Sequence, residues 1–590
     1  MSQTPTPPIK SSIAAALREA ANPVSPAAVP NSAGPANSAV AAPPQSDWVT
    51  LKIDGREVQV KKGTNLLEAC LQNGVDVSYF CYHPGLSSPA VCRQCLVEVV
   101  GQPKLVPACY TPVADKMEVH TATPRVLTIR RQILEFTLLN HPVDCPICDK
   151  AGECTLQKQY QNWDHESSRS STPKVHKPKA RDIGPHIVLD AERCILCSRC
   201  VRVCDEVAGV KQLTMAWRGD REQLTVAPGH QLDNPYSLNT VDVCPVGALT
   251  SKDFRFTMRA WELFSTPSLC PGCATGCNIE IHHAQGEIWR LVPRENLDVN
   301  KYWMCDEGRF TYKDVRHRRV SSARLGAGRG QPAQITKLDK ALSFAAERIV
   351  MLATNGSVFG LVFSPHASNE ALFALSQVAA QLSQRGVRVR SYVTGLAARP
   401  ERADRILRHA DVNPNTAGAR FFAQAGAGDA NQLVKDLQDN RLGALWMVGT
   451  ELPFDEREQL ELAPAFDSPE MFLCQAVQDS PILRRAHIVL PTTSWAELDG
   501  TFTNAQNRVQ RVRRAVAPHG DARSHLEHIS VLAQKATLFQ GEKWQVSARQ
   551  AFLQMVAQVS AADGAGLGIS QAEWGRDYLP VQLRFANSRG

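Results

Sequence analysis

The sequence predicts a multidomain protein in which small, cysteine-rich α+β domains precede a larger α/β domain. Its 590 residues suggest about four domains at roughly 150 residues each. Seventeen of the 18 cysteines lie between Cys70 and Cys305, which marks this half of the chain as chemically specialised. After about residue 325, apolar strand-like runs alternate with amphipathic helical patterns, which is typical of an α/β layer with a mostly parallel sheet.

Composition and charge argue against several classes of protein. Hydrophobic residues at 43% and charged residues at 21% are ordinary for globular proteins. The net charge is +7, but Lys and Arg are not clustered among aromatic residues, so the sequence does not indicate nucleic-acid binding. The small positive charge is compatible with an acidic protein partner. Because no apolar run reaches 18 residues, no direct membrane span is expected.

The cysteines are expected to be reduced, cytoplasmic thiolates that bind metal. A disulfide framework is typical of a short secreted chain with a signal peptide, whereas this chain starts MSQTPTPPIKSS. Residues 1–46 are rich in Ala, Pro and Ser and are expected to form a disordered tail. A transit peptide is less favoured, because Arg18 is the only arginine in this segment.

Secondary structure can be predicted in order along the chain. In the N-terminal part, strands are expected over 49–53, 56–60 and 95–100, and helices over 65–74 and 122–140. Asp54-Gly55 has the pattern of a hairpin turn, and residues 155–185 that of a polar surface connector. In the C-terminal part, strand-like runs occupy 357–363, 387–393, 444–449, 471–477 and 486–491, with helical patterns over 368–386 and 431–440.

Four sets of four possible metal ligands can be distinguished by spacing. The first set has the spacing C-x10-C-x2-C-x13-C and consists of Cys81, Cys92, Cys95 and Cys109. Soft thiolates on a flexible loop suit an iron–sulfur cluster or zinc. The β-rich context of this spacing favours a [2Fe–2S] cluster in a plant-type ferredoxin domain of the β-grasp fold.

The second set contains a histidine. It has the spacing H-x3-C-x2-C-x5-C and consists of His141, Cys145, Cys148 and Cys154. Spacing alone leaves two readings of His141 open, as a ligand or as a helix-terminal residue beside a three-cysteine site. As a ligand, its neutral imidazole would replace a thiolate charge and make the cluster easier to reduce.

The third set has the pattern of a bacterial ferredoxin site. A C-x2-C-x2-C run with a distal Cys-Pro indicates a [4Fe–4S] site, with the candidate ligands Cys194, Cys197, Cys200 and Cys244. Cys204 completes an alternative C-x2-C-x2-C-x3-C pattern, but this segment has no second such run to share it. Cys204 is therefore interpreted as a buried thiol that binds no cluster.

The fourth set completes the assignment. It has the spacing C-x2-C-x3-C-x27-C and consists of Cys270, Cys273, Cys277 and Cys305. The four sets use 15 of the 18 cysteines and one histidine, and leave Cys70, Cys204 and Cys474 over. Zinc fits single C-x2-C pairs but fits the whole series poorly, because zinc sites usually pair two such units across a short gap.

Catalytic machinery is not visible in the sequence. No Ser/His/Asp or paired-carboxylate arrangement stands out. The segment LGAGRG at 325–330 follows a basic stretch rather than a strand, so it is expected to be a loop and not a dinucleotide site. No dinucleotide is therefore expected to bind at this segment.

Several segments together match one family. They are CYHPGLSSPAVCRQCLVEV, LLNHPVDCPICDKAGECTLQ, RCILCSRCVRVCDEV, VDVCPVGALT, LCPGCATGC and VLPTTSWAELDGTFTNAQNRVQR. Over about residues 47–535 the chain resembles the large iron–sulfur subunits of bacterial NADH-quinone oxidoreductase, respiratory complex I, which are known as its G subunits.

The resemblance implies the cofactors and their ligands. The first set would hold one [2Fe–2S] cluster, and the other three sets would each hold a [4Fe–4S] cluster, with His141 as a ligand. The fourth cluster would lie off the main electron path. Electrons would come from NADH and FMN on a neighbouring subunit and pass toward quinone, in a complex on the cytoplasmic side of the inner membrane.

The resemblance also implies a domain order. The expected parts are a tail (1–46), a 2Fe-2S ferredoxin-type domain (47–125), a 4Fe-4S domain with one histidine and three cysteine ligands (126–180), a 4Fe-4S ferredoxin-like domain (181–262), a 4Fe-4S domain of the Mo/W-oxidoreductase type (263–320), a shortened molybdopterin-oxidoreductase-like domain (321–540) and a tail (541–590). No molybdenum centre is expected, because only Cys474 follows Cys305 and it lies in an apolar run.

Two alternatives remain open from the sequence. The first is a relay subunit of a soluble NAD-linked hydrogenase or formate dehydrogenase, which shares the first three sets. The second is a zinc-bearing scaffold that only binds partners, which would be colourless and would contain stoichiometric zinc.

Overall fold

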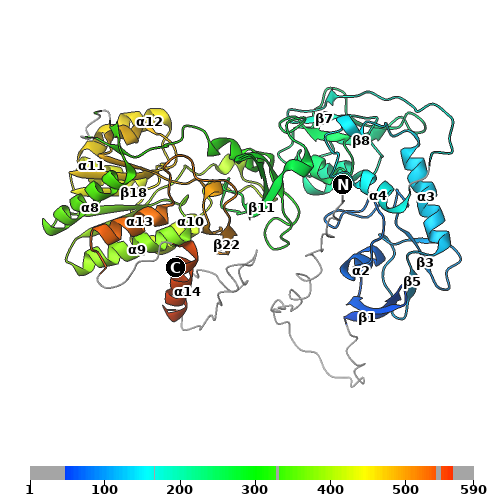
Figure 1. Ribbon diagram of the computed structural model, residues 1–590, viewed down its shortest axis with the longest axis horizontal. Coiled ribbons are helices and arrows are strands. Elements are labelled where there is room, and N and C mark those ends of the chain that lie inside the picture. The colour runs from blue at the N-terminus through cyan, green and yellow to red at the C-terminus, as the bar shows by residue number, and fades with distance from the viewer. Residues whose placement is uncertain (1–46, 165–166, 327–330, 332, 540–546, 563–590) are drawn as a thin grey trace, which may run out of the picture. The chain divides into compact units, whose positions relative to one another are not determined.

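A computed structural model describes residues 47–164, 167–326, 331, 333–539 and 547–562. The chain divides into two compact units (Figure 1). The first unit contains the described residues up to Asp233 and Thr240–Lys252, and the second contains Asn234–Asn239 and the described residues from Asp253 onward. Among the described residues, no helix has the length and apolar character needed to cross a membrane.

The first unit begins with a mixed five-stranded sheet and one helix. The bounds are β1 Trp48–Ile53, β2 Arg56–Lys61, β3 Leu96–Val99, β4 Val106–Pro107, β5 Glu118–His120 and α2 Leu66–Gln72. The strand order is β2-β1-β5-β3-β4, with β1 and β5 parallel and the other pairs antiparallel. Asp54 and Gly55 have φ angles of 48° and 79°, as a tight hairpin turn requires. The predicted ferredoxin-type fold of this part is confirmed.

Two helices follow this sheet. They are α3 Pro124–Leu139 and α4 Thr155–Trp163, separated by the short 3-10 helix η1 Cys145–Ile147. The Thr123 hydroxyl caps α3 by accepting a hydrogen bond from the amide of Val126. The prediction of a connector over 155–185 is wrong for the part that forms α4, because this helix buries Leu156 and Gln159.

The remainder of the first unit is built from short elements. They are β6 Arg181–Asp182, β7 Ile187–Leu189, α5 Arg199–Arg202, the π-helix η2 Val203–Val207, β8 Leu213–Ala216, β9 Gln223–Val226 and β10 Leu249–Ser251. The helix α6 Asn239–Val243 begins at the boundary between the units. The sheet order is β10-β7-β6, and β8 pairs with β9.

The second unit begins with a small antiparallel sheet. Its elements are η3 Ala260–Glu262, β11 Phe264–Leu269, β12 Asn278–Ala284 and β13 Glu287–Pro293, followed by α7 Asp306–Arg309 and η4 Thr311–Val315. The strand order is β11-β12-β13. Ile279 and Ile281 of β12 and Leu291 of β13 are buried in one core cluster that also contains Cys270 and Cys277.

A seven-stranded sheet forms the centre of the second unit. Its strands are β14 Arg324–Leu325, β15 Gln334–Ile335, β16 Phe359–Phe363, β17 Val389–Val393, β18 Ala444–Val448, β19 Met471–Ala476 and β20 Ile488–Pro491. The order is β15-β14-β20-β19-β18-β16-β17. The strands from β16 to β20 are parallel, and β14 and β15 run antiparallel at one end. The predicted α/β layer with a mostly parallel sheet is confirmed.

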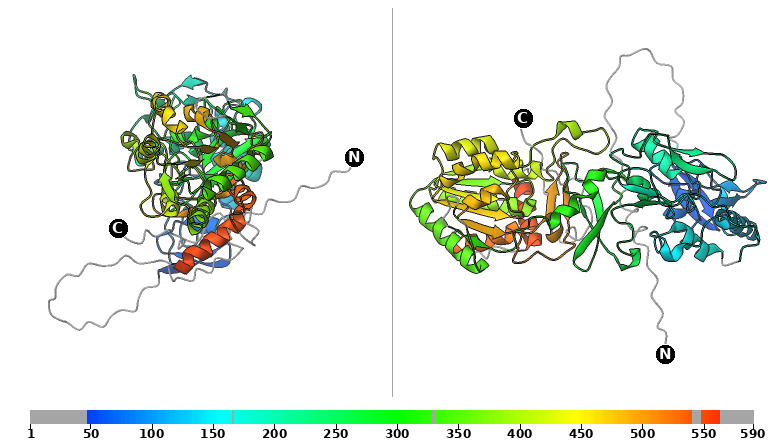
Figure 2. Two further views of the ribbon diagram at one scale, coloured as in Figure 1. Left: turned by 90° about the vertical axis from the view of Figure 1, so that its left-hand side faces the viewer. Right: turned by 90° about the horizontal axis from the view of Figure 1, so that it is seen from above.

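Helices cover both faces of this sheet. They are α8 Leu338–Thr354, α9 Asn369–Gln384, α10 Thr416–Ala423, α11 Ala430–Gln438, α12 Glu456–Leu462, α13 His525–Lys535 and α14 Ala548–Ala562. Phe359, Leu361 and Phe363 of β16 share a core with α8, α9 and α13, whereas Val362 shares a second core with α11. Figure 1 shows these two helical layers on opposite faces of the sheet, and Figure 2 shows them from two further directions.

Short connecting elements complete the second unit. They are η5 Pro400–Arg402, η6 Ala463–Asp467, η7 Pro481–Arg485, η8 Trp495–Glu497, β21 Gly500–Thr503 and β22 Val509–Val512. The predicted C-terminal tail contains α14, which packs Phe552 and Met555 into the core of the sheet. The predicted N-terminal tail lies outside the described residues. In the predicted loop at 325–330, Leu325 belongs to β14 and residues 327–330 lie outside the described part.

Candidate iron–sulfur sites

The first set converges on a loop beside the five-stranded sheet. The amide of Cys81 lies 3.5 Å from Sγ of Cys92. The Cys81 thiol is hydrogen-bonded to the thiols of Cys92 and Cys109, which lowers its pKa, and Cys109 also contacts Cys95. The four predicted ligands therefore lie together, which is the arrangement that a small thiolate-bound cluster needs.

Local backbone conformation explains how this loop closes. Ala90 and Arg93 have positive φ angles of 52° and 55° on either side of Cys92. Such angles are uncommon for residues other than glycine and reverse the chain direction sharply. The loop thereby brings Cys92 back toward Cys81.

The second set lies where α3 ends and α4 begins. Cys154 is the N-cap of α4, and its Sγ accepts a hydrogen bond from the amide of Gln157 at 3.5 Å. Cys145 is exposed and Cys148 is buried. The thiol of Cys154 interacts electrostatically with those of Cys148 and Cys145, so the three thiols are neighbours.

His141 has the properties of a neutral ligand. Burial, with Lys174 and Arg193 nearby, lowers the pKa of its imidazole to about 4. Its Nδ1 atom is buried and makes no hydrogen bond to any atom of the described part of the chain. An imidazole must be neutral to bind a metal, and an unpaired buried nitrogen is a suitable donor.

The third set lines a cavity in the first unit. The cavity is bounded by apolar residues together with Cys194, Cys197, Cys200 and Cys244. Burial raises the pKa of Cys194 to about 12 and that of Cys197 to about 11. Buried thiolates are unfavourable without a compensating positive charge, and bound iron supplies such a charge. The cavity and its donors therefore fit a cluster.

Cys204 lies apart from this cavity. It is fully buried in the π-helix η2. Among the described residues that line the cavity, Cys204 does not occur. The interpretation of Cys204 as a buried thiol that binds no cluster stays a prediction.

The fourth set is held by close backbone turns in the second unit. The amide of Gly272 lies 3.4 Å from Sγ of Cys270, and the amide of Gly308 lies 3.3 Å from Sγ of Cys305. A Cβ atom on Gly308 would lie 3.0 Å from Sγ of Cys270 and 3.3 Å from that of Cys305. The glycine therefore keeps open the space between two thiols that the sequence assigns to one cluster.

Within the described ranges, no three His, Cys, Asp or Glu side chains are close enough together to hold a single metal ion. Ligands of an iron–sulfur cluster bind different iron atoms, so they surround a larger volume.

Three of the four sets are physically joined within the first unit. Between the third and second sets, the amide of Thr155 donates to the carbonyl of Pro245 at 2.9 Å, and Arg193 pairs with Asp144 at 2.9 Å. Each of these residues directly neighbours a predicted ligand. Between the first and third sets, Arg202 donates to the carbonyls of Ser87 and Cys81. Residues beside the third set thus contact residues of both the first and the second set, although the third set follows both along the chain.

The sequence patterns did not identify the residues that make these connections. Arg199 and Arg202 occur in the run C-S-R-C-V-R, whose pattern is dominated by its cysteines. Gly247 follows Cys244 by three residues, and a Cβ atom on it would meet Cys148. The basic residues and glycines near the predicted ligands are the features of the sequence that could have pointed to these contacts between the sets.

The cysteine in the C-terminal sheet is a core residue. Cys474 is fully buried in β19, and its thiol lies 3.8 Å from the carbonyl oxygen of Gly449. Burial raises its pKa well above the ordinary value. These properties agree with the interpretation of Cys474 as part of the hydrophobic core.

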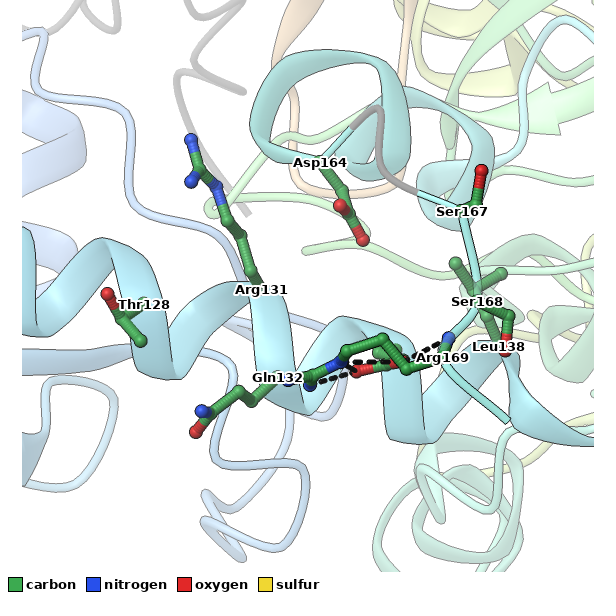
Figure 3. A pocket seen from close by; sticks show the side chains of 9 residues that line it. Thr128, Arg131, Gln132, Leu138, Asp164, Ser167, Ser168 and Arg169 are labelled. Carbon is green, nitrogen blue, oxygen red and sulfur yellow. Dashed lines mark hydrogen bonds and ion pairs between the residues drawn. The ribbon is translucent and has the colours of Figure 1, made fainter. Parts of the chain in front are cut away.

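A polar surface pocket lies along α3. It is lined by Thr128, Arg131, Gln132, Glu135, Leu138, Asp164, Ser167, Ser168 and Arg169 (Figure 3). Arg169 lies across Glu135 with Nε 3.0 Å from the carboxylate, and this contact lowers the pKa of Glu135. Glu135 and Arg169 therefore form an ion pair with each other, and this arrangement does not suit either side chain for acid–base catalysis.

Family models match five parts of the chain. They are described as a 2Fe-2S iron-sulfur cluster binding domain (residues 46–124), the NADH-ubiquinone oxidoreductase-G iron-sulfur binding region (130–169), the ferredoxin-like domain of NADH-quinone oxidoreductase subunit 3 (184–250), the molybdopterin oxidoreductase Fe4S4 domain (264–317) and molybdopterin oxidoreductase (409–535). The chain therefore carries 2Fe-2S and 4Fe-4S binding domains followed by a molybdopterin-oxidoreductase-like domain.

Several relatives share extensive sequence with the chain. The NADH-ubiquinone oxidoreductase 75 kDa subunit of Reclinomonas americana is 38% identical over 368 residues, which cover 62% of this chain and 53% of the relative. The G subunit of NADH-quinone oxidoreductase from Streptomyces coelicolor is 37% identical over 350 residues, or 58% of this chain and 41% of the relative. The chain spans about half the length of the curated relatives it matches.

One solved structure has a weaker likeness. It is the crystal structure of an NAD+-reducing [NiFe]-hydrogenase, with 29% identity over 36% of this chain and 90% of the other. The TM-score is 0.33, which is too low to support an argument from shared structure.

Proposed function

We infer that this chain, a homologue of the large iron–sulfur subunits of NADH-quinone oxidoreductase over the part that they share, is an electron-relay subunit of such an enzyme. The enzyme is respiratory complex I, a translocase. In this proposal NADH, FMN and quinone bind on partner subunits, and this chain carries electrons between them.

The arrangement of the first three sets is the observation that carries the proposal. Their predicted ligands lie in one compact unit. Residues beside the third set contact residues of both the first and the second set. Electron carriers held in such close contact suit a relay, whereas a scaffold for single zinc ions needs no contact between its sites.

Each set has a proposed cofactor. The first set would hold one [2Fe–2S] cluster, and the second, third and fourth sets would each hold one [4Fe–4S] cluster, which supply one-electron carriers when bound. The protein contributes ligands, burial and fixed spacing. The fourth set lies in the second unit, and we assign it to a cluster off the main path. We assign no molybdenum centre to residues 321–540, because Cys474 is committed to the core.

The proposed partners follow from the same homology. They are the other subunits of the peripheral arm, including the subunit that binds NADH and FMN. The proposed location is the cytoplasmic side of the inner membrane, held there by the complex.

The proposal can be tested on the complex purified through an affinity tag on this chain. Cys197→Ala should remove the third cluster and abolish electron flow from NADH to quinone. Cys474→Ala is the matched control, because it changes a buried cysteine outside all four sets, and it should leave both the clusters and the electron flow intact. Unchanged electron flow in Cys197→Ala would contradict the proposal.

The purified partners provide a second test. Membrane-arm subunits should purify with the tagged chain. Recovery of a soluble hydrogenase or formate dehydrogenase instead would contradict the assignment to complex I and support the alternative relay function.

A further inference from the structure

Two arginines of α5 lie between the ligands of the third set and the loop of the first set. Arg199 and Arg202 are only 8% and 9% exposed. They are three residues apart on a helix and so lie on the same face. Cys197 precedes this pair and Cys200 falls within it.

The guanidinium of Arg202 contacts both cluster sites. Its Nη2 donates a hydrogen bond to the carbonyl oxygen of Cys81, a ligand of the first set. The same atom lies 3.5 Å from the carbonyl oxygen of Cys197, a ligand of the third set. Its Nη1 donates to the carbonyl of Ser87 in the first-set loop. The cation of Arg202 therefore contacts the backbone carbonyls of two predicted ligands, Cys81 and Cys197, which are 116 positions apart in the sequence.

Arg199 makes a parallel connection. Its Nη2 donates to the carbonyl of Tyr82, the residue after Cys81. Its Nη1 lies 3.2 Å from the carbonyl oxygen of Val243, the residue before Cys244. Arg199 also lines the cavity of the third set, and its charge acts on the thiol of Cys197.

Both arginines retain an uncommitted donor. The Nε atoms of Arg199 and Arg202 are buried and make no hydrogen bond to an acceptor among the residues that the structure describes. A buried N–H group that lacks an acceptor is costly, and thiolate or sulfide atoms of a bound cluster are acceptors of the required kind. A cluster bound at the third site would offer such acceptors to the two Nε atoms, in addition to the carbonyls that the Nη atoms contact.

Glu206 provides an opposite charge in the same contact. Its carboxylate accepts hydrogen bonds from both the amide and the hydroxyl of Ser87. Ser87 is therefore held from two sides, by the cation of Arg202 through its carbonyl and by the anion of Glu206. Removing either side chain loosens the same loop, but the two removals change the local charge in opposite directions.

We propose that Arg202 is a shared electrostatic bridge that raises the reduction potentials of the clusters at both the first and the third sites, with Arg199 adding to the effect at the third. Reduction adds an electron to a buried cluster, and a nearby cation stabilises the reduced form, most strongly where water is excluded. Because Arg202 contacts ligand peptides of both sets, its removal acts on two clusters at once. This inference rests on the proposed function, since it requires clusters at both sites.

The competing explanation is that Arg202 only clamps the loop. A clamp predicts that Arg202→Met and Glu206→Gln have the same effect on both clusters, because each removes one hold on Ser87. The electrostatic bridge predicts opposite signs. Loss of the cation lowers both potentials, and loss of the anion raises them by a smaller amount, because Glu206 is exposed and therefore screened.

The test is a redox titration of the purified complex, monitored by EPR, with Arg202→Met, Arg202→Lys and Glu206→Gln beside the unaltered protein. At a fixed ambient potential, Arg202→Met should reduce the ratio of reduced to oxidised cluster about tenfold for the [2Fe–2S] species and for one [4Fe–4S] species, equivalent to about 59 mV for a one-electron couple. Arg202→Lys keeps the charge and should restore most of that ratio. The other [4Fe–4S] species serve as internal controls and should not move.

Distinct results separate the possible failures. Absence of the two EPR species in the unaltered protein overturns the proposed function. If both species are present, then unchanged potentials in Arg202→Met, a shift in only one of them, or shifts of the same sign in Glu206→Gln each overturn the bridge. If Arg202→Met does not load its clusters, the comparison of Arg202→Lys with Glu206→Gln still decides the sign.

Discussion

A Cβ atom placed on Gly247 would lie 2.3 Å from Sγ of Cys148. Gly247 follows Cys244, a predicted ligand of the third set, by three residues, and Cys148 belongs to the second set. The two sites are thus so close that one cannot gain a methyl group without displacing a thiol of the other. This contact explains why a glycine occupies the position, although its φ angle is not in the left-handed region.

Gly247→Ala is expected to damage the second cluster while sparing the third. The added methyl group must push Cys148 away, and overpacking of this kind typically costs about 1–3 kcal/mol. EPR should show loss or broadening of the signal from the histidine-ligated cluster. Gly229→Ala is the matched control, because it strains a left-handed glycine whose added carbon would meet no described atom within 4 Å apart from those of its chain neighbours. If Gly247→Ala and Gly229→Ala change the EPR signal of the second cluster equally, the predicted clash between the added methyl group and Cys148 is contradicted.

His141→Cys should leave a cluster in place but lower its reduction potential. The substitution replaces a neutral ligand by a thiolate, and the added negative charge disfavours the reduced form. The check is a redox titration of the purified complex, with His141→Ala as the variant that lacks any ligand. A potential that stays the same or rises in His141→Cys would count against the ligand assignment.

Cys204→Ala should leave the iron content unchanged, whereas Cys200→Ala should lose the third cluster. Both residues are buried and lie four positions apart, but only Cys200 lines the cavity. The measurement is iron and acid-labile sulfide per chain. Loss of iron in Cys204→Ala would assign it to the ligand set and revise the role of Cys244.

Cys273→Ala should remove one [4Fe–4S] EPR species and largely spare electron flow from NADH to quinone. This expectation follows from the assignment of the fourth set, which lies in the second unit, to a cluster off the main path. Abolished turnover in a complex that still assembles would refute the off-path assignment.

Two buried histidines should make the protein less stable as the pH falls. Burial lowers the pKa of His525 to about 3 and that of His528 to about 4, from an ordinary value of 6.5. Between pH 6.5 and about 4, the unfolded chain binds protons that the folded chain does not. Each histidine therefore removes up to about 1.4 kcal/mol of stability per pH unit in this window.

The check is the thermal unfolding midpoint of the second unit within the full chain, measured from pH 7 to pH 4. His528→Gln removes one titrating group and retains an N–H donor for the carbonyl of Pro491, which His528 contacts at 2.8 Å. Its midpoint should fall less steeply with acid than that of the unaltered chain. If the unfolding midpoints of His528→Gln and of the unaltered chain fall equally steeply with acid, His528 does not contribute to the loss of stability at low pH.

The sequence predicted local features better than spatial order. The turn at Asp54-Gly55, the parallel sheet and the core position of Cys474 all depend on short-range patterns, and the structure agrees with them. The helix α4 was missed because its residues are mostly polar, with Leu156 as its one buried large apolar residue.

The spatial order of the sites could not be predicted from spacing. Spacing identifies which cysteines belong to one set, but contacts such as Arg202 to Cys81 join residues more than 100 positions apart. These contacts depend on how the β-rich domain packs onto α5, which no local pattern encodes. The identity of the ligands and the domain boundaries remain predictions.

The central claim is that this chain holds a series of iron–sulfur clusters. Its most direct test is to isolate the tagged chain in its native complex, count iron and sulfide in this subunit, and record EPR spectra after reduction. We predict about 14 iron atoms in this chain, with one [2Fe–2S] and three [4Fe–4S] species. A colourless subunit with stoichiometric zinc and no reducible signal would contradict the claim.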